Sequence, residues 1–183
     1  MRAQPFAVTL TAVTTRDIEG AALRGLIQTF IRSAGLLAGD QTPCGHPVAV
    51  SHAHALMVLL ETARTGNHMS QRELGQALGI DKSNVARLCR RMEGAGHLVQ
   101  SRSADDGRAR ILSLTARGTR LAKDVERSSG DRYESLMSAI PERSRAGVLS
   151  SLSCLNRALA STVPQREIRP ARRKSTNADG GRT

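Results

Sequence analysis

Small polar and cationic side chains alternate along residues 82–91, and groups of these types can bind anions or the edges of nucleic-acid bases. Guanidinium groups form paired hydrogen bonds with phosphates and with guanine O6 and N7, and an Asn amide matches adenine N6 and N7. A Ser hydroxyl near a helix start can hold a phosphate beside the backbone N–H groups. Helical spacing places five of these residues on one solvent-facing side: Ser83, Asn84, Arg87, Arg90 and Arg91. The pattern favours duplex DNA as the ligand over the plainer alternative, a solvated cationic face on an ordinary helix.

Two short helices are expected to carry these residues. Ser70 and Glu73 have the spacing of a capping box, in which each side chain bonds to the backbone N–H of the other residue. Gly79 should end this first helix, and Asp81 should cap the second. The apolar spacing predicts the buried positions, with Cys89 at their edge: Leu74, Ala77, Leu78, Val85, Leu88 and Met92. Two helices joined by a glycine turn in this way are typical of a helix-turn-helix.

Gly94-Ala95-Gly96 should end the second helix, and a hairpin is predicted directly after it. Strands at 97–102 and 109–114 flank the turn Asp105-Asp106-Gly107, and together they form what is called the wing below. Arg108 at its tip could enter a narrow minor groove, with Asp106 holding the guanidinium in place. A surface hairpin with an incidental ion pair is the alternative. The full set of expected DNA-binding residues is Ser70, Lys82, Ser83, Asn84, Arg87, Arg90, Arg91, Arg102, Asp106, Arg108 and Arg110.

The distribution of charge supports this assignment. The 183-residue chain has 27 Lys and Arg against 16 Asp and Glu, a net charge of +11. Residues 70–120 hold 10 basic and 5 acidic side chains, and residues 164–183 hold 6 and 2, whereas the two remaining stretches are nearly balanced. A cationic surface confined to the helix-turn-helix and a basic tail is suited to nucleic acid.

The segment Gln71–Gly118 resembles the winged helix-turn-helix core of the MarR family of bacterial regulators. The matching motifs occur in the family's order: Glu73-Leu74-Gly75, Leu78-Gly79-Ile80, Asp81 to Leu88, Met92 to Val99, Asp106-Gly107-Arg108 and Leu114 to Gly118. By layout the resemblance extends over residues 18–161. Ala86 departs from the pattern, because the family often has Ser or Thr there, and the arm at residues 1–17 and the basic tail are additions.

The resemblance implies a mainly α fold with a small β-wing, in which N- and C-terminal dimerisation helices flank the winged helix-turn-helix domain. It further implies a homodimer that binds a pseudo-palindromic operator in double-stranded DNA, most often as a repressor. Each subunit would place one recognition helix in the major groove and one wing in the minor groove. A small ligand or cysteine oxidation would release the DNA, which suggests a role in stress response. An apolar molecule or aromatic acid bound between the dimerisation and DNA-binding lobes is the expected effector.

The flanking segments supply the predicted dimerisation helices. Residues 6–12 alternate like a short strand or extended arm, and a helix with one wide apolar face is predicted for residues 18–38. A loop and a helix capped by Ser51 and ending near Arg64 follow. A long helix capped by Thr115 could kink at residues 128–130, and Pro141 suits the first turn of a last helix. That last helix has an apolar stripe of Val148, Leu152, Leu155 and Leu159.

Three parts of the chain are therefore expected. Residues 1–17 form an arm and residues 18–163 form the winged helix-turn-helix domain with its dimerisation helices, whose DNA-binding core spans 51–118. Residues 164–183, rich in Arg, Pro, Ser, Asn and Gly, are predicted to be a disordered basic tail.

A second group of reactive side chains lies within eleven residues: Cys44, His46, His52 and His54. Such residues can bind Zn²⁺ or Cu, but the spacing matches no standard site, and His52 and His54 should point to different sides of a helix. His54 could instead be a packed core histidine. Cys44, in a Pro- and Gly-containing loop, is the best candidate for a redox-sensitive thiol. Cys89 and Cys154 are predicted to be core residues.

Other classes of protein are disfavoured. No apolar run reaches the ~18 residues of a membrane span, and three widely separated cysteines do not form a disulfide framework, so a cytoplasmic protein without a membrane partner is expected. No nucleophile–base pair, phosphate-binding loop or paired acidic motif indicates an enzyme, and no cofactor is indicated. The main alternative to a DNA-binding regulator is a winged-helix module for protein interaction without sequence-specific DNA binding.

Overall fold

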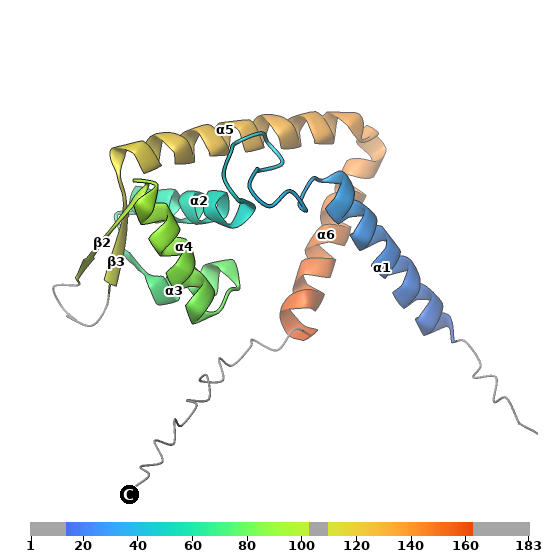
Figure 1. The fold of residues 1–183 in the computed structure, drawn as a ribbon. Helices are drawn as coiled ribbons and strands as arrows, with labels where there is room; N and C mark the ends of the chain where they lie inside the picture. Colours follow the sequence, from blue (N-terminus) through green and yellow to red (C-terminus); the bar gives the residue numbers. More distant parts are fainter. Residues whose placement is uncertain (1–13, 103–109, 163–183) are drawn as a thin grey trace, which may run out of the picture. The chain divides into compact units, whose positions relative to one another are not determined.

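A computed structural model describes residues 14–102 and 110–162 of the chain (Figure 1). It divides into two compact units, Met1–Val50 and Ser51–Thr183. Three predicted features lie outside the described residues: the strand at residues 6–12, the tip of the wing and the basic tail.

The first unit contains helix α1, Thr15–Ser33, followed by a loop. Thr14 and Asp17 form a capping box that starts the helix, so it begins three residues before the predicted position. It also ends five residues early, because Gly35 adopts φ 74° and the Leu36 N–H bonds back to the Ile31 carbonyl at 3.1 Å. None of the residues that the structure describes in α1 is buried: Ile18, Leu23, Leu26 and Phe30 on its apolar face are exposed, and Ile27 and Ile31 are partly exposed.

The second unit holds the remaining elements, which all belong to the winged helix-turn-helix and the helices that follow it. They are α2 (Val50–Arg64), β1 (Met69–Ser70), α3 (Gln71–Leu78), α4 (Lys82–Gly94), β2 (Leu98–Arg102), β3 (Arg110–Leu114), α5 (Ala116–Ala139) and α6 (Glu142–Thr162). The predicted mainly α fold with a small β-wing is confirmed, with the strands forming one antiparallel sheet in the order β1-β3-β2. Two boundaries differ from the prediction: Ser51 lies inside α2, which begins at Val50, instead of capping it, and Pro141 immediately precedes α6.

The core joins α2, α3, α4, the sheet and the first half of α5. Its buried residues are Ala55, Leu56, Leu59, Leu60, Leu74, Val85, Leu88, Cys89, Met92, Leu98, Leu112 and Ala122. Ala77 was predicted to be buried but is exposed, and Gly75 is buried in its place. A Cβ on Gly75 would lie 3.2 Å from the Ile80 carbonyl oxygen and 3.4 Å from a Val85 methyl, so α3 approaches α4 at its glycine. This contact fixes α4 against α3.

Helix α5 begins at a tight junction with the turn between α4 and β2. Thr115 caps the helix by accepting the Gly118 N–H at 2.9 Å and donates its hydroxyl proton to the Gly96 carbonyl at 2.7 Å. Gly118 is buried against His97 so closely that a Cβ there would lie 2.0 Å from the His97 carbonyl oxygen. The helix then continues without interruption through residues 128–130 (Figure 1).

Helix α6 resembles α1 in burying none of the residues that the structure describes in it. In its predicted apolar stripe, Leu152 and Leu159 are exposed, and Leu149 beside them is exposed as well. No helix in the described ranges combines the length and apolar character needed to cross a membrane.

Candidate nucleic-acid interface

Helix α4 begins at Asp81, and the carboxylate of this residue organises its first turn. Asp81 Oδ1 accepts the backbone N–H groups of Ser83 and Asn84, each at 2.9 Å, as the predicted N-cap should. Its Oδ2 accepts a hydrogen bond from the Asn84 side-chain amide at 2.7 Å. These bonds lower the pKa of Asp81, with the backbone bond from Asn84 making the largest contribution. The capping residue is therefore a carboxylate at neutral pH.

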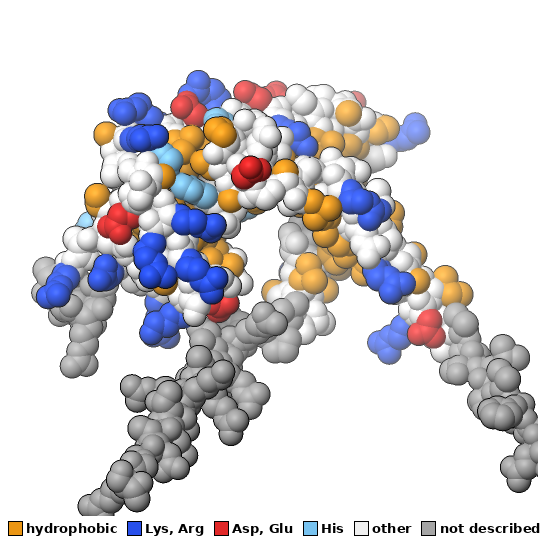
Figure 2. Space-filling model, in the orientation of Figure 1, with side chains coloured by type: hydrophobic (Ala, Val, Ile, Leu, Met, Phe, Trp, Pro, Cys, Tyr) orange, Lys and Arg blue, Asp and Glu red, His pale blue; other side chains and the backbone are white. Residues whose placement is uncertain are grey.

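The outer face of α4 is polar, cationic and open to solvent. Six predicted DNA-binding residues are exposed on it: Lys82, Ser83, Asn84, Arg87, Arg90 and Arg91. Figure 2 shows Lys and Arg side chains gathered over this part of the molecule. The opposite face packs Val85, Leu88 and Met92 into the core, so the helix cannot rotate its cationic face away. Such a face can meet phosphates and base edges.

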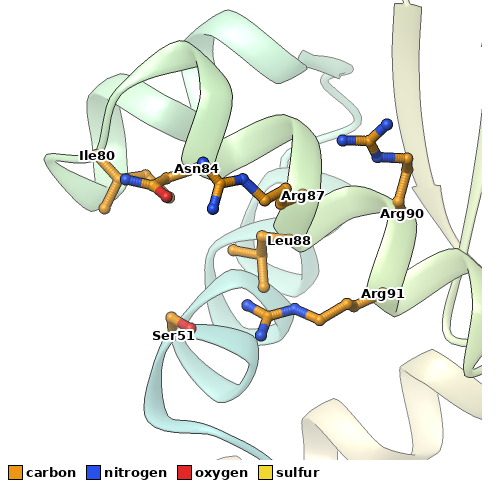
Figure 3. Close-up of a pocket in the computed structure, with 7 residues that line it drawn as sticks. All are labelled: Ser51, Ile80, Asn84, Arg87, Leu88, Arg90 and Arg91. Atoms are coloured by element: carbon orange, nitrogen blue, oxygen red, sulfur yellow. The ribbon is translucent and has the colours of Figure 1, made fainter.

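A hollow of about 530 Å³ lies where this face meets the start of α2. Its lining is Ser51, Ile80, Asn84, Arg87, Leu88, Arg90 and Arg91. In Figure 3, Arg91 reaches from α4 toward Ser51 on α2, and Asn84 lies beside Arg87. Three guanidinium groups and a hydroxyl around this open hollow can bind anionic groups, beside the apolar side chains of Ile80 and Leu88.

Ser70 differs from the other predicted residues because its hydroxyl is already engaged. It donates to Glu73 Oε2 at 2.8 Å, accepts the Glu73 backbone N–H at 3.3 Å, and the Ser70 backbone N–H bonds to the same carboxylate at 2.7 Å. These bonds from Ser70 lower the pKa of Glu73. The predicted capping box is confirmed, and the Ser70 hydroxyl caps the start of α3.

Two exposed arginines lie opposite each other where the strands of the wing reach the turn. Arg102 on β2 is the register partner of Arg110 on β3. Like charges directly opposite each other in an antiparallel pair are unfavourable, and an anion placed between them would relieve the repulsion. The other two predicted wing residues, Asp106 and Arg108, lie outside the described residues.

Three side chains not identified from the sequence join the wing to both helices. Gln100 on β2 accepts a hydrogen bond from Gln71 Nε2 at the start of α3, and its own Nε2 donates to Glu93 Oε2 on α4 at 2.8 Å. This Gln71–Gln100–Glu93 chain fixes the wing relative to α3 and α4. Polar residues are common on any solvent face, so the sequence held no signal that these three would meet.

The cysteine and histidine side chains of residues 44–54 do not form one cluster in the structure. His52 is buried and its Nε2 lies 3.1 Å from Nδ1 of buried His97, whereas His54 is exposed, so His52 and not His54 is the packed histidine. The two residues do point to different sides of α2, as predicted. Cys44 is half-buried, with its Sγ 3.3 Å from the Thr42 hydroxyl.

The structure does not assemble the predicted metal-ligating set. Across residues 14–102 and 110–162, no three His, Cys, Asp or Glu side chains come close enough to hold a metal ion. Cys89 is buried as predicted, and burial raises the pKa of its thiol to about 11. Cys154 is exposed, contrary to the prediction, because α6 buries none of its described residues.

Comparison with known proteins agrees with this geometry. The model of the MarR family matches residues 50–109, from α2 into the wing. This segment is a MarR-family domain. The domain comprises the helix-turn-helix and the first strand of the wing, the parts that carry the cationic face. No curated protein matches the chain.

Solved structures share the fold at low sequence identity. A probable transcriptional regulator from Pseudomonas aeruginosa is 21% identical with a TM-score of 0.59, and the match covers 78% of this chain and 99% of that one. FabT of Streptococcus pneumoniae, in complex with DNA, is 16% identical with a TM-score of 0.60, covering 81% and 99%. The PcaV transcriptional regulator of Streptomyces coelicolor, in complex with its natural ligand, is 21% identical with a TM-score of 0.56, covering 84% and 99%. These matches show that the fold is shared over 78–84% of this chain, well beyond residues 50–109.

Proposed function

We propose that this protein is a homodimeric transcriptional repressor that binds a pseudo-palindromic operator in double-stranded DNA. The observation that carries the proposal is the exposed row Lys82, Ser83, Asn84, Arg87, Arg90 and Arg91 on a helix whose other face is locked in the core. A helix fits the major groove, where such side chains reach base edges and phosphates. The DNA-bound FabT structure, similar in fold, supports this use of the domain.

The wing would contribute backbone contacts beside the recognition helix. Arg102 and Arg110 supply two positive charges where the strands of the wing reach the turn, and Arg108 is proposed to enter the minor groove from the tip. Gln100 hydrogen-bonds the wing to α3 and α4. The wing and α4 would therefore approach the duplex at a fixed angle to each other.

The dimer is proposed from the uncovered apolar faces of the flanking helices. Ile18, Leu26 and Phe30 on α1 are all more than half exposed, and α6 presents Leu149, Leu152 and Leu159 (Figure 2 shows hydrophobic side chains along α1). A continuous apolar face open to water is unfavourable, and a two-fold pair of subunits would cover it. The two winged helix-turn-helix domains of such a dimer, called its DNA-binding heads below, would contact successive major grooves about 34 Å apart.

A signal that alters the spacing of the two heads would release the operator. We propose a small apolar or aromatic-acid ligand, by analogy with the ligand-bound PcaV structure, or oxidation of half-exposed Cys44.

The test is selection of duplexes from a random pool, followed by affinity measurement over a salt series. A repressor of this kind selects a sequence with two half-sites, and its affinity for random duplex falls steeply as salt rises. A protein-interaction module with an incidental cationic face would select no sequence and show a shallow salt slope. That result would overturn the proposal.

A further inference from the structure

The two oxygens of Asp81 have different partners. Oδ1 accepts the two backbone N–H groups that cap α4, and Oδ2 is left to the Asn84 side-chain amide at 2.7 Å. Both residues are at the surface, on the turn that leads into the exposed face of α4. A cap alone requires one oxygen, so the second bond is an additional function of this carboxylate.

This second bond determines which way the Asn84 amide points. An ionised carboxylate can only accept hydrogen bonds, so the NH₂ group of Asn84 must face Asp81. The reversed amide would bring two oxygens to 2.7 Å without a proton between them, which is strongly repulsive. The amide carbonyl therefore points away from Asp81, and one N–H of the NH₂ group remains available.

We propose that Asp81 is a positioning residue that sets Asn84 to recognise adenine in the major groove. This inference rests on the proposed function and deepens it. Adenine presents an acceptor at N7 and a donor at N6, which match one amide N–H and one amide carbonyl. A side chain already held in its bound orientation loses less conformational entropy on binding. Asn84 therefore reads one adenine in each half-site, and Asp81 keeps the amide in the reading orientation.

The first arm of the test uses the operator obtained by selection. In the native protein, replacing the contacted adenine with guanine, or with 7-deazaadenine, lowers affinity by roughly 5- to 150-fold, the range expected for one bidentate pair. Asn84→Ala abolishes this preference at one position in each half-site and leaves the preferences elsewhere in place.

The second arm separates orientation from capping. Asp81→Ser keeps a hydroxyl oxygen that can cap α4 but has no second oxygen to hold Asn84. Its adenine preference at that same position falls at least 5-fold. Its affinity for random duplex stays the same or rises, because a negative charge has left a surface that faces phosphates.

A matched cap on another helix controls for lost stability. Thr115→Ala removes the cap of α5 and the hydrogen bond to the Gly96 carbonyl, so it lowers stability while Asp81 and Asn84 keep their own bonds. It leaves the adenine preference of the native protein unchanged.

Three results overturn the inference while leaving the proposed function intact. They are an unchanged adenine preference in folded Asp81→Ser, an equal loss of affinity for every sequence in that variant, and no position-specific loss in Asn84→Ala. If the native protein selects no duplex at all, the proposed function itself fails, and the inference fails with it.

Discussion

His52 and His97 meet in the interior with Nε2 of one 3.1 Å from Nδ1 of the other, joining the start of α2 to the residue before β2. Their rings cross at 67°, and both side chains are almost fully buried. Burial first, then the charges of His97 and Arg91, lower the pKa of His52 to about 4. Burial and the charge of Arg117 lower that of His97. Both rings are therefore neutral at pH 7, one donating and the other accepting.

This histidine pair should make the free energy of unfolding depend on pH. In the unfolded chain His52 titrates near 6.5, so between pH 6.5 and about 4 the unfolded state binds a proton that the folded state does not. Stability should fall as pH falls through that window, by up to about 1.4 kcal/mol per pH unit for this group. Urea denaturation at pH 7.5 and pH 5 measures the loss.

His52→Gln should reduce that pH dependence, since Gln can still bond to His97 but does not titrate. His54→Gln, two residues along and exposed, is the control and should leave the native pH dependence unchanged. Equal pH profiles for native protein and His52→Gln would show that the buried ring does not carry the effect.

Two glycines of α5 should respond to alanine in opposite directions. Gly118→Ala would place a methyl group 2.0 Å from the His97 carbonyl oxygen and 2.8 Å from its carbon, both backbone atoms, so we expect a loss of about 2–3 kcal/mol. Gly130→Ala meets no atom within 4 Å and should stabilise the same helix by about 0.5–1 kcal/mol. The free energy of unfolding from denaturant titration distinguishes them. A neutral Gly118→Ala would mean that the junction of α5 with His97 is looser than described.

Loss of one arginine at the turn end of the wing strands should weaken DNA binding without harming the fold. Arg102→Ala or Arg110→Ala removes a proposed phosphate contact, so affinity should fall for all sequences and the slope of log K against log salt should decrease by about one. Stability should stay or rise slightly, because the like-charge pair is relieved. Arg127→Ala on α5, where the guanidinium pairs with Asp124, is the matched loss of charge. An effect as large from Arg127→Ala would argue for general charge and against a contact at the wing.

A charge on the apolar face of α1 should disrupt the proposed dimer. Leu26 is 71% exposed in the single chain, so Leu26→Glu has little to disturb within the subunit and should raise the dimer Kd at least tenfold by sedimentation equilibrium. Gln28→Glu adds the same charge on the other side of the helix and should have no such effect. Identical mass distributions for the two variants would remove this face from the dimer interface.

Local signals made much of the fold predictable. Capping residues act within three positions along the chain, so Ser70, Asp81 and Thr115 could be assigned from the sequence alone, and each caps its predicted helix. Glycine at a required left-handed position is equally local, as Gly79 with φ 64° shows. The exposed face of α4 followed from helical spacing in the same way.

Contacts between distant residues were not predictable. Gln71 and Gln100 are 29 residues apart and His52 and His97 are 45 apart, and their meeting depends on how the sheet and helices pack. Strand β1 is two residues long, too short for an alternating pattern to show. Helical periodicity also predicted wrongly that Ala77 is buried. The residue of α3 that lies against α4 is Gly75, because the two helices approach so closely there that a side chain would not fit easily.

The Gln71–Gln100–Glu93 chain also bears on how regulators of this type could diversify. Since it joins α3, α4 and β2, the wing cannot be re-aimed without remaking hydrogen bonds on two helices. Single substitutions on the outer face of α4 can change which bases are preferred while the geometry of the head is kept. A new distance between half-sites would have to arise in the segments outside the head. Base preference and operator spacing would then evolve through separate sets of residues.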